Sequence, residues 1–143
     1  MTAQDDSGTG QRLASTGVSG WEVTHAVALG DIDGDGDTDA VFGGALFGGV
    51  GSFDTVWVND GAGRFRLYAE HRLKPGGDDF FGQSEAVRLG DLDRDGDLDA
   101  FVGNTRFVNP DGVWFNDGHG QFTDSGQRLG DGQHRCGPGR RGR

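Results

Sequence analysis

Carboxylates recur with one spacing at two places in the chain, residues 31–39 and residues 91–99. Each segment has aspartate at positions 1, 3, 5, 7 and 9 and glycine at position 6. The alternate spacing turns several side chains toward one centre, and the glycine permits the sharp bend of a tight loop. Carboxylates this close repel one another unless a hard cation lies among them. An acidic surface turn would not require the same spacing twice, so we predict one calcium ion in each loop.

Calcium prefers six to eight oxygen ligands, and a main-chain carbonyl commonly supplies one of them. We therefore expect the side chain at position 7 to point outward while its carbonyl binds. The predicted ligands are the side chains of Asp31, Asp33, Asp35 and Asp39 with the carbonyl of Asp37, and the side chains of Asp91, Asp93, Asp95 and Asp99 with the carbonyl of Asp97.

The two loops differ at position 4, which is Gly34 in the first and Arg94 in the second. The positive charge of Arg94 is expected to weaken the second site slightly. Magnesium suits the loops less because it requires compact octahedral geometry and retains waters. Zinc lacks its usual nitrogen and sulfur ligands here.

The segments around the loops also recur, so the chain is a repeat. Asp31 and Asp91 are 60 residues apart, whereas Trp57 and Trp114 are 57 apart. The difference of three residues falls in one glycine-rich connection between the second loop and Trp114. Length changes confined to a connection are typical of stacked or radial repeat proteins.

Short segments rich in β-branched and aromatic residues dominate the sequence, and no segment has a helical stripe. Residues 59–63 and 116–120 are predicted hairpin turns, because Asn and Gly tolerate the positive φ that such turns need. Four short antiparallel strands in about 60 residues indicate an all-β fold built of β-propeller blades. The expected strands are 26–29, 40–42, 56–58 and 65–68 in the first unit and 86–89, 100–102, 113–115 and 122–123 in the second.

Two other calcium motifs do not fit these loops. An EF-hand and a dockerin-like loop both need an acid at position 12, where this chain has Phe42 and Val102. An aspartate at position 9 followed by a β segment instead resembles the FG-GAP/VCBS repeats, as in the β-propeller of integrin α subunits. The resemblance covers roughly residues 6–129 and includes the Val-Ala-Leu-Gly run that precedes the first loop.

The resemblance implies that the loop joins the first two strands of a blade and binds calcium structurally. It also implies an extracellular or cell-surface protein that serves adhesion or contacts with proteins or glycans. Residues 1–6 lack a basic and an apolar region, so we expect no signal peptide in this sequence.

We divide the chain into a first repeat over residues 1–65, a second over 66–123 and the start of a third over 124–143. The basic tail after Leu129 departs from the pattern, and we hypothesise that it is a frameshifted third repeat; a nucleic-acid or heparin-binding tail is the alternative. Two blades and part of a third cannot close a propeller of about four to eight blades. We expect either self-association that completes a propeller or a fragment of a longer protein.

Composition favours a water-soluble chain with no membrane insertion, because no apolar run is long enough to span a bilayer. The net charge of −10 argues against nucleic acid, although two bound ions would cancel about four of those charges. The single Cys136 excludes an internal disulfide.

No nucleophile motif, phosphate loop or Cys/His pairing occurs, so we predict a protein that is not an enzyme.

The paired Trp57 and Trp114 are expected to pack inside or between blades. Trp21 and the pair Phe80–Phe81 have no such match and are candidates for ligand contact.

Three function classes stay open. An adhesion module would bind through the connections 43–55 and 103–112, a lectin-like propeller would bind carbohydrate, and an accessory segment would serve a larger secreted enzyme.

Overall fold

The computed structural model describes residues 11, 21–47, 54–68, 73, 83–105 and 110–130. Its regular elements are eight strands in two four-stranded antiparallel sheets. Within each sheet the strand order follows the sequence, so every connection is between neighbours. The strands are β1 (Trp21–Gly30), β2 (Asp39–Phe47), β3 (Thr55–Asn59), β4 (Phe65–Leu67), β5 (Gln83–Gly90), β6 (Asp99–Thr105), β7 (Asp111–Asn116) and β8 (Phe122–Leu129).

The two sheets are copies of one plan. In each, the last residue of the first strand pairs with the first residue of the second strand. These pairs are Gly30 with Asp39 and Gly90 with Asp99. In each, the register shifts at one residue of the first strand, His25 or Glu85. The matching bulges show that the repeat extends to the irregularities of the strands, which supports reading each sheet as one propeller blade.

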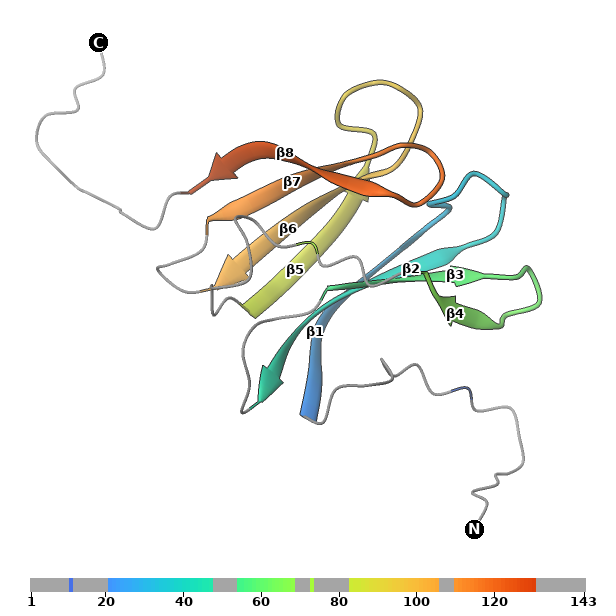
Figure 1. Ribbon diagram of the computed structural model, residues 1–143, viewed down its shortest axis with the longest axis horizontal. Helices are drawn as coiled ribbons and strands as arrows, with labels where there is room; N and C mark the ends of the chain where they lie inside the picture. The colour runs from blue at the N-terminus through green and yellow to red at the C-terminus, as the bar shows by residue number, and fades with distance from the viewer. Residues whose placement is uncertain are drawn as a thin grey trace, which may run out of the picture.

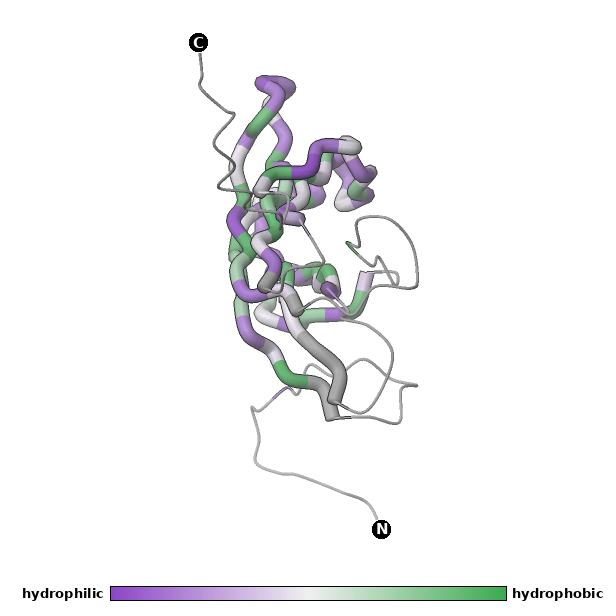
Figure 2. The backbone as a smooth tube through the Cα atoms, turned by 90° about the vertical axis from the view of Figure 1, so that its left-hand side faces the viewer, coloured by the Kyte–Doolittle hydropathy of each residue, from purple (hydrophilic) through white to green (hydrophobic). Residues whose placement is uncertain are grey.

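The sheets meet through their first strands. β5 packs against both β1 and β2, so the first strand of the second sheet lies beside the first two strands of the first sheet (Figure 1). The core contains a set of valines with no exposed surface, and Figure 2 shows hydrophobic and hydrophilic positions alternating along the strands. These fully buried valines are Val41, Val56, Val87 and Val102.

The predicted strands are confirmed, and most are longer than their apolar centres. β1 begins five residues before the expected segment, and β8 runs to Leu129. Hydrogen bonding to a neighbouring strand carries polar and glycine residues into the ladder, which an apolar pattern does not reveal. The prediction that the paired tryptophans are packing residues is also confirmed, because Trp57 and Trp114 are 6% and 5% exposed.

The hairpin turns form as predicted, but one stated reason was wrong. Gly61 and Gly63 have φ values of 82° and 80°. Asn59 is not among the described residues with positive φ. Its side-chain oxygen instead accepts hydrogen bonds from the N–H groups of both glycines, at 3.2 and 3.0 Å. Asparagine is therefore needed as an acceptor that closes the turn.

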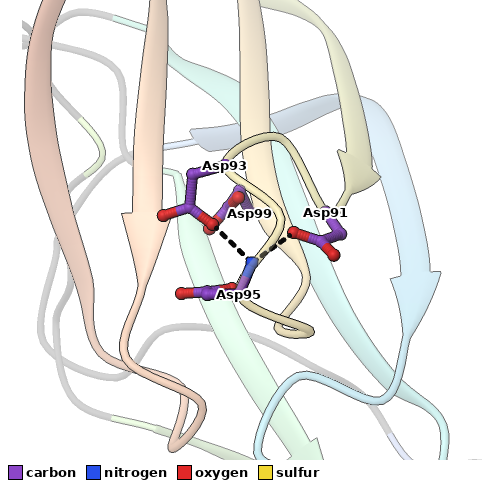
Figure 3. A group of neighbouring side chains, drawn as sticks. All are labelled: Asp91, Asp93, Asp95 and Asp99. Atoms are coloured by element: carbon purple, nitrogen blue, oxygen red, sulfur yellow. Dashed lines mark hydrogen bonds between the residues drawn. The ribbon is translucent and has the colours of Figure 1, made fainter.

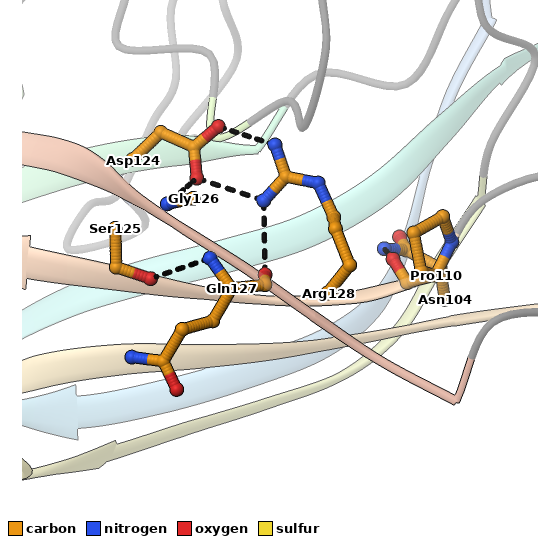
Figure 4. A network of polar contacts seen from close by, with 7 residues as sticks. All are labelled: Asn104, Pro110, Asp124, Ser125, Gly126, Gln127 and Arg128. Atoms are coloured by element: carbon orange, nitrogen blue, oxygen red, sulfur yellow. Dashed lines mark hydrogen bonds and ion pairs between the residues drawn. The ribbon is translucent and has the colours of Figure 1, made fainter.

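A local network shapes the last strand of the second sheet (Figure 4). Arg128 donates two hydrogen bonds to the Asp124 carboxylate, at 2.6 and 2.9 Å, and lowers the pKa of that carboxyl group. Asp124 also accepts the N–H of Gly126, which has a φ of 79°. Asn104 ties the end of β6 to the carbonyl of Pro110 at the start of β7.

The division of the chain into repeats stays a prediction, since it depends on where a repeat is taken to begin. Residues 124–129, which the sequence assigned to the start of a third repeat, pair with β7 in the second sheet. The tail beyond residue 130, with Cys136 and the frameshift hypothesis, lies outside the described residues. So do residues 48–53 and 106–109 of the two connections proposed for ligand binding, the side chain of Trp21, and Phe80 and Phe81.

We predict that Gly43→Ala destabilises the fold by about 1–3 kcal/mol, because its new Cβ would lie 2.8 Å from Val87 Cγ2 and overpack the contact between sheets. Gly103→Ala is the matched control. A Cβ there would meet Ala86 Cβ at an ordinary 3.5 Å. Urea unfolding at low protein concentration measures both variants, and equal effects would contradict the packing described for this junction.

Candidate metal centre

Each acidic loop joins the first two strands of its sheet. The first loop, residues 31–39, runs from the end of β1 to the start of β2, and the second, residues 91–99, runs from β5 to β6. The glycine at position 6 has a φ of 92° in the first loop and 96° in the second. The predicted sharp bend is therefore present at Gly36 and Gly96.

In the second loop four carboxylates converge. One oxygen from each of Asp91, Asp93, Asp95 and Asp99 lies within 4.8 Å of the others (Figure 3). The main-chain N–H of Asp95 donates to Asp91 and to Asp93, each at 3.1 Å, and these bonds wrap the loop around the side chains. Oxygen atoms gathered at this spacing are the donor set that Ca²⁺ prefers.

The first loop gathers three of its predicted ligands. Oxygens of Asp31, Asp33 and Asp39 lie within 4.8 Å of one another, and Asp35 is not part of this group. Asp31 accepts the N–H groups of Gly34 at 2.8 Å and Gly36 at 3.0 Å. Both loops thus place a carboxylate cluster at the same point of the repeat, with the second cluster the more complete.

The aspartate at position 9 has a second role that the sequence did not reveal. Asp39 is fully buried, and its two oxygens accept the N–H groups of Ile32 and Asn59, both at 2.8 Å. Asp99 is also fully buried and accepts the N–H groups of Leu92 at 2.8 Å and Asn116 at 2.9 Å. This aspartate clasp fastens the start of the loop and the end of the third strand to the second strand. Each carboxylate oxygen retains a lone pair that a cation could use.

The aspartate at position 7 turns away from the cluster. A Cβ on Gly61 would lie 2.6 Å from Asp37 Oδ2, and one on Gly118 would lie 2.8 Å from Asp97 Oδ2. Both side chains therefore lie against the hairpin turn of their own sheet, and neither belongs to the converging groups. That their carbonyls bind the ion stays a prediction.

Asn116 was missed as a residue of the loop region. Its Nδ2 donates to the carbonyls of Leu98, at 3.1 Å, and Ile32, at 2.8 Å, so it joins the two loops. The signal was present in the identical Asn-Asp-Gly turns, which the sequence analysis treated only as turns. Arg94 also departs from expectation, because it has a φ of 68° in the left-handed region that glycine occupies in the first loop.

In the absence of an ion, desolvation and the clustered negative charges of each loop raise the pKa of some of its aspartates. Desolvation raises the pKa of Asp33, and repulsion by Asp39 and Asp35 raises it further. Desolvation also raises the pKa of Asp93, with the side chain of Asp95 acting in the same direction. Nearby negative charge favours the protonated form, and a bound cation would reverse this effect.

Comparison with known families supports this architecture. The sequence model of the FG-GAP-like repeat matches residues 45–102. The chain contains an FG-GAP-like repeat. The matched segment begins in β2 and ends in β6, so it includes the whole second acidic loop and the strand β5 that packs against the first sheet. Comparison with curated proteins and with solved structures found no match.

FG-GAP-like repeats are typically non-catalytic and usually extracellular. Within the described residues, no helix has the length and apolar character needed to cross a membrane.

Two aspartate variants should separate the clasp from the ion ligands. Asp39→Ala removes two charge-assisted hydrogen bonds and should destabilise the fold by about 3 kcal/mol or more, with or without calcium. Asp33→Ala should lower stability only when calcium is present. Thermal unfolding of both variants in calcium and in chelator tests this, and an Asp39→Ala protein of normal stability in chelator would contradict the clasp.

The raised pKa values of Asp33 and Asp93 predict that removing these two charges changes the melting temperature in a way that depends on pH and on calcium. A raised folded-state pKa stabilises the ion-free fold at low pH, and this contribution is lost as the pH rises from about 4 through the raised values. In calcium-free buffer, Asp33→Asn with Asp93→Asn should therefore raise the melting temperature at pH 7 and have little effect near pH 4. In calcium the same variant should melt lower than the unaltered protein at pH 7. A calcium-free difference that does not change with pH would show that loop repulsion is absent.

Proposed function

We propose that this chain is a calcium-binding module in which each acidic loop holds one structural ion. The observation that carries the proposal is the convergence of carboxylates at the same point of both repeats. In each sheet this point lies between the first two strands, next to the fully buried aspartate of the clasp. An ion there would neutralise the loop and link its side chains to a residue that already holds two strands and the start of the loop together.

The donor chemistry favours calcium among the common metals. The converging ligands are all oxygens, and Ca²⁺ accepts six to eight oxygens in irregular geometry, whereas Mg²⁺ requires a compact octahedron. Carboxylates committed to an ion and to backbone N–H groups have little capacity for acid–base chemistry. The ion is accordingly proposed to stabilise the fold and not to take part in a reaction.

We further propose that the module works outside the cell, in adhesion or in contacts with a protein or glycan ligand. The usual extracellular setting of FG-GAP-like repeats supports this placement, since calcium there is abundant enough for weak sites of this kind to fill. The burial of Trp57 and Trp114 removes the two matched aromatic residues from the candidates for sugar platforms. This favours a contact module over a lectin-like propeller with aromatic sites repeated in each blade.

Calorimetric titration with calcium tests the proposal. We expect two binding sites in the unaltered protein, one in Asp33→Ala and one in Asp93→Ala. Each site should add about 2.7 kcal/mol to the free energy of unfolding when calcium is present at about 100 times its Kd. Magnesium at the same concentration is the control and should stabilise much less. Absence of calcium binding in the folded protein would refute the proposed function.

A further inference from the structure

The junction between the two sheets is built from side chains seated on glycines. A Cβ on Gly43 would lie 2.8 Å from Val87 Cγ2, and a Cβ on Gly30 would lie 3.2 Å from Leu89 Cδ1. The first sheet contributes Ile32, which is only 1% exposed and belongs to the common core. The strands approach closely because the first sheet has no side chain at the two glycine positions.

Polar contacts fix the same junction. Ser84 on β5 donates its hydroxyl to Asp54 Oδ2 at 2.8 Å, and both residues are buried. Asn116 donates to the carbonyl of Ile32 at 2.8 Å. The first sheet thus supplies glycines, an apolar side chain and acceptors, and the second supplies apolar side chains and donors.

The second sheet has its own copy of the glycines, apolar side chain and acceptor that the first sheet contributes to the junction. We call it the acceptor face, and it consists of Gly90, Leu92, Gly103 and Asp111, the counterparts of Gly30, Ile32, Gly43 and Asp54. Leu92 is 48% exposed where Ile32 is 1% exposed. Around Gly90 and Gly103, the nearest described atoms all belong to the second sheet and its own loop.

The first sheet carries a copy of the other part. We call it the donor face, and it consists of Thr24, Val27, Leu29 and Asn59, the counterparts of Ser84, Val87, Leu89 and Asn116. Val27 is 48% exposed where Val87 has no exposed surface, and Leu29 is 63% exposed. Thr24 keeps the hydroxyl donor of Ser84. One contact has no copy: a Cβ on Gly30 would also lie 2.7 Å from Leu98 Cδ1, and the counterpart of Leu98 in the first sheet is Thr38.

We propose that the acceptor face of one chain binds the donor face of a second copy of this chain, head to tail, through the same contacts that join the two sheets. Val27 and Leu29 of one copy then seat on Gly103 and Gly90 of the other. Thr24 donates to Asp111, and Asn59 donates to the carbonyl of Leu92. Leu92, Val27 and Leu29 leave water together, and this burial supplies the driving force.

Charge at the edge of the junction favours the same partner. A Cβ on Gly34 would lie 3.4 Å from the carbonyl of Gly118, so position 4 of the loop meets the hairpin turn of the next sheet. In the second loop this position is Arg94, and the turn it would meet in a second copy contains Asp60. A head-to-tail contact uses two different faces and continues until a ring closes. Rings of about four to eight blades correspond to roughly two to four copies.

Mixing two variants tests the proposal. Leu92→Asp disables the acceptor face and leaves the donor face intact, whereas Val27→Asp does the reverse. The unaltered protein should form assemblies of a defined number of copies in light scattering with calcium and reductant, because reductant removes any Cys136 disulfide. Each variant alone should be monomeric, and an equal mixture should form a dimer through its one intact junction. Thr123→Asp is the control, because Thr123 is exposed on the outer strand β8 and pairs with Phe115, which belongs to neither face, and this variant should assemble normally.

A monomeric unaltered protein at all concentrations up to about 100 µM would overturn the proposal. So would assembly of either variant alone, which would indicate a symmetric contact between identical faces. Thermal unfolding verifies that each variant is folded. If either aspartate variant is unfolded, Gly103→Val and Leu29→Ser replace the pair, with the same expected loss alone and recovery on mixing.

Discussion

The fold depends on a carboxylate that is buried with both of its oxygens hydrogen-bonded. Asp39 and its counterpart Asp99 have no exposed surface, and each accepts N–H groups from the start of its loop and from the end of the third strand. A buried carboxylate is tolerated only when such bonds compensate its lost hydration. The aspartate at position 9 binds the N–H of position 2, so the two ends of each nine-residue loop are held together. The aspartates between them converge because the chain must turn back within this short distance.

The sequence was sufficient for the repeat, the strand order and the position of both loops. It succeeded there because spacing and alternation follow directly from strand geometry and from the bend at Gly36 and Gly96. It did not predict the clasp or the bridging role of Asn116. Both depend on hydrogen bonds to main-chain N–H and C=O groups, and the position of these groups in space cannot be read from the residue types. It also could not distinguish Ile32 from Leu92, two similar side chains in matching loops whose exposure differs only because one lies under a neighbouring sheet.

Glycine has two separate uses in this chain, and only one is conformational. At Gly61 and Gly118 positive φ values form the hairpin turns. At Gly30 and Gly43 the backbone is not in the left-handed region, and the absence of a side chain makes room for the second sheet. Close approach of the strands at these two glycines therefore adds to the packing that the buried apolar side chains supply.

The junction between the sheets also has an evolutionary consequence. Each unit of about 60 residues carries both halves of the contact, glycines and Asp54 on one side and Val87, Leu89 and Ser84 on the other. A duplicated unit would therefore bring most of the contacts of this junction with it to the end of an existing array. Such a gene can lengthen or shorten by whole units through recombination between its own repeats, and selection then acts on the number of blades instead of on the design of each interface.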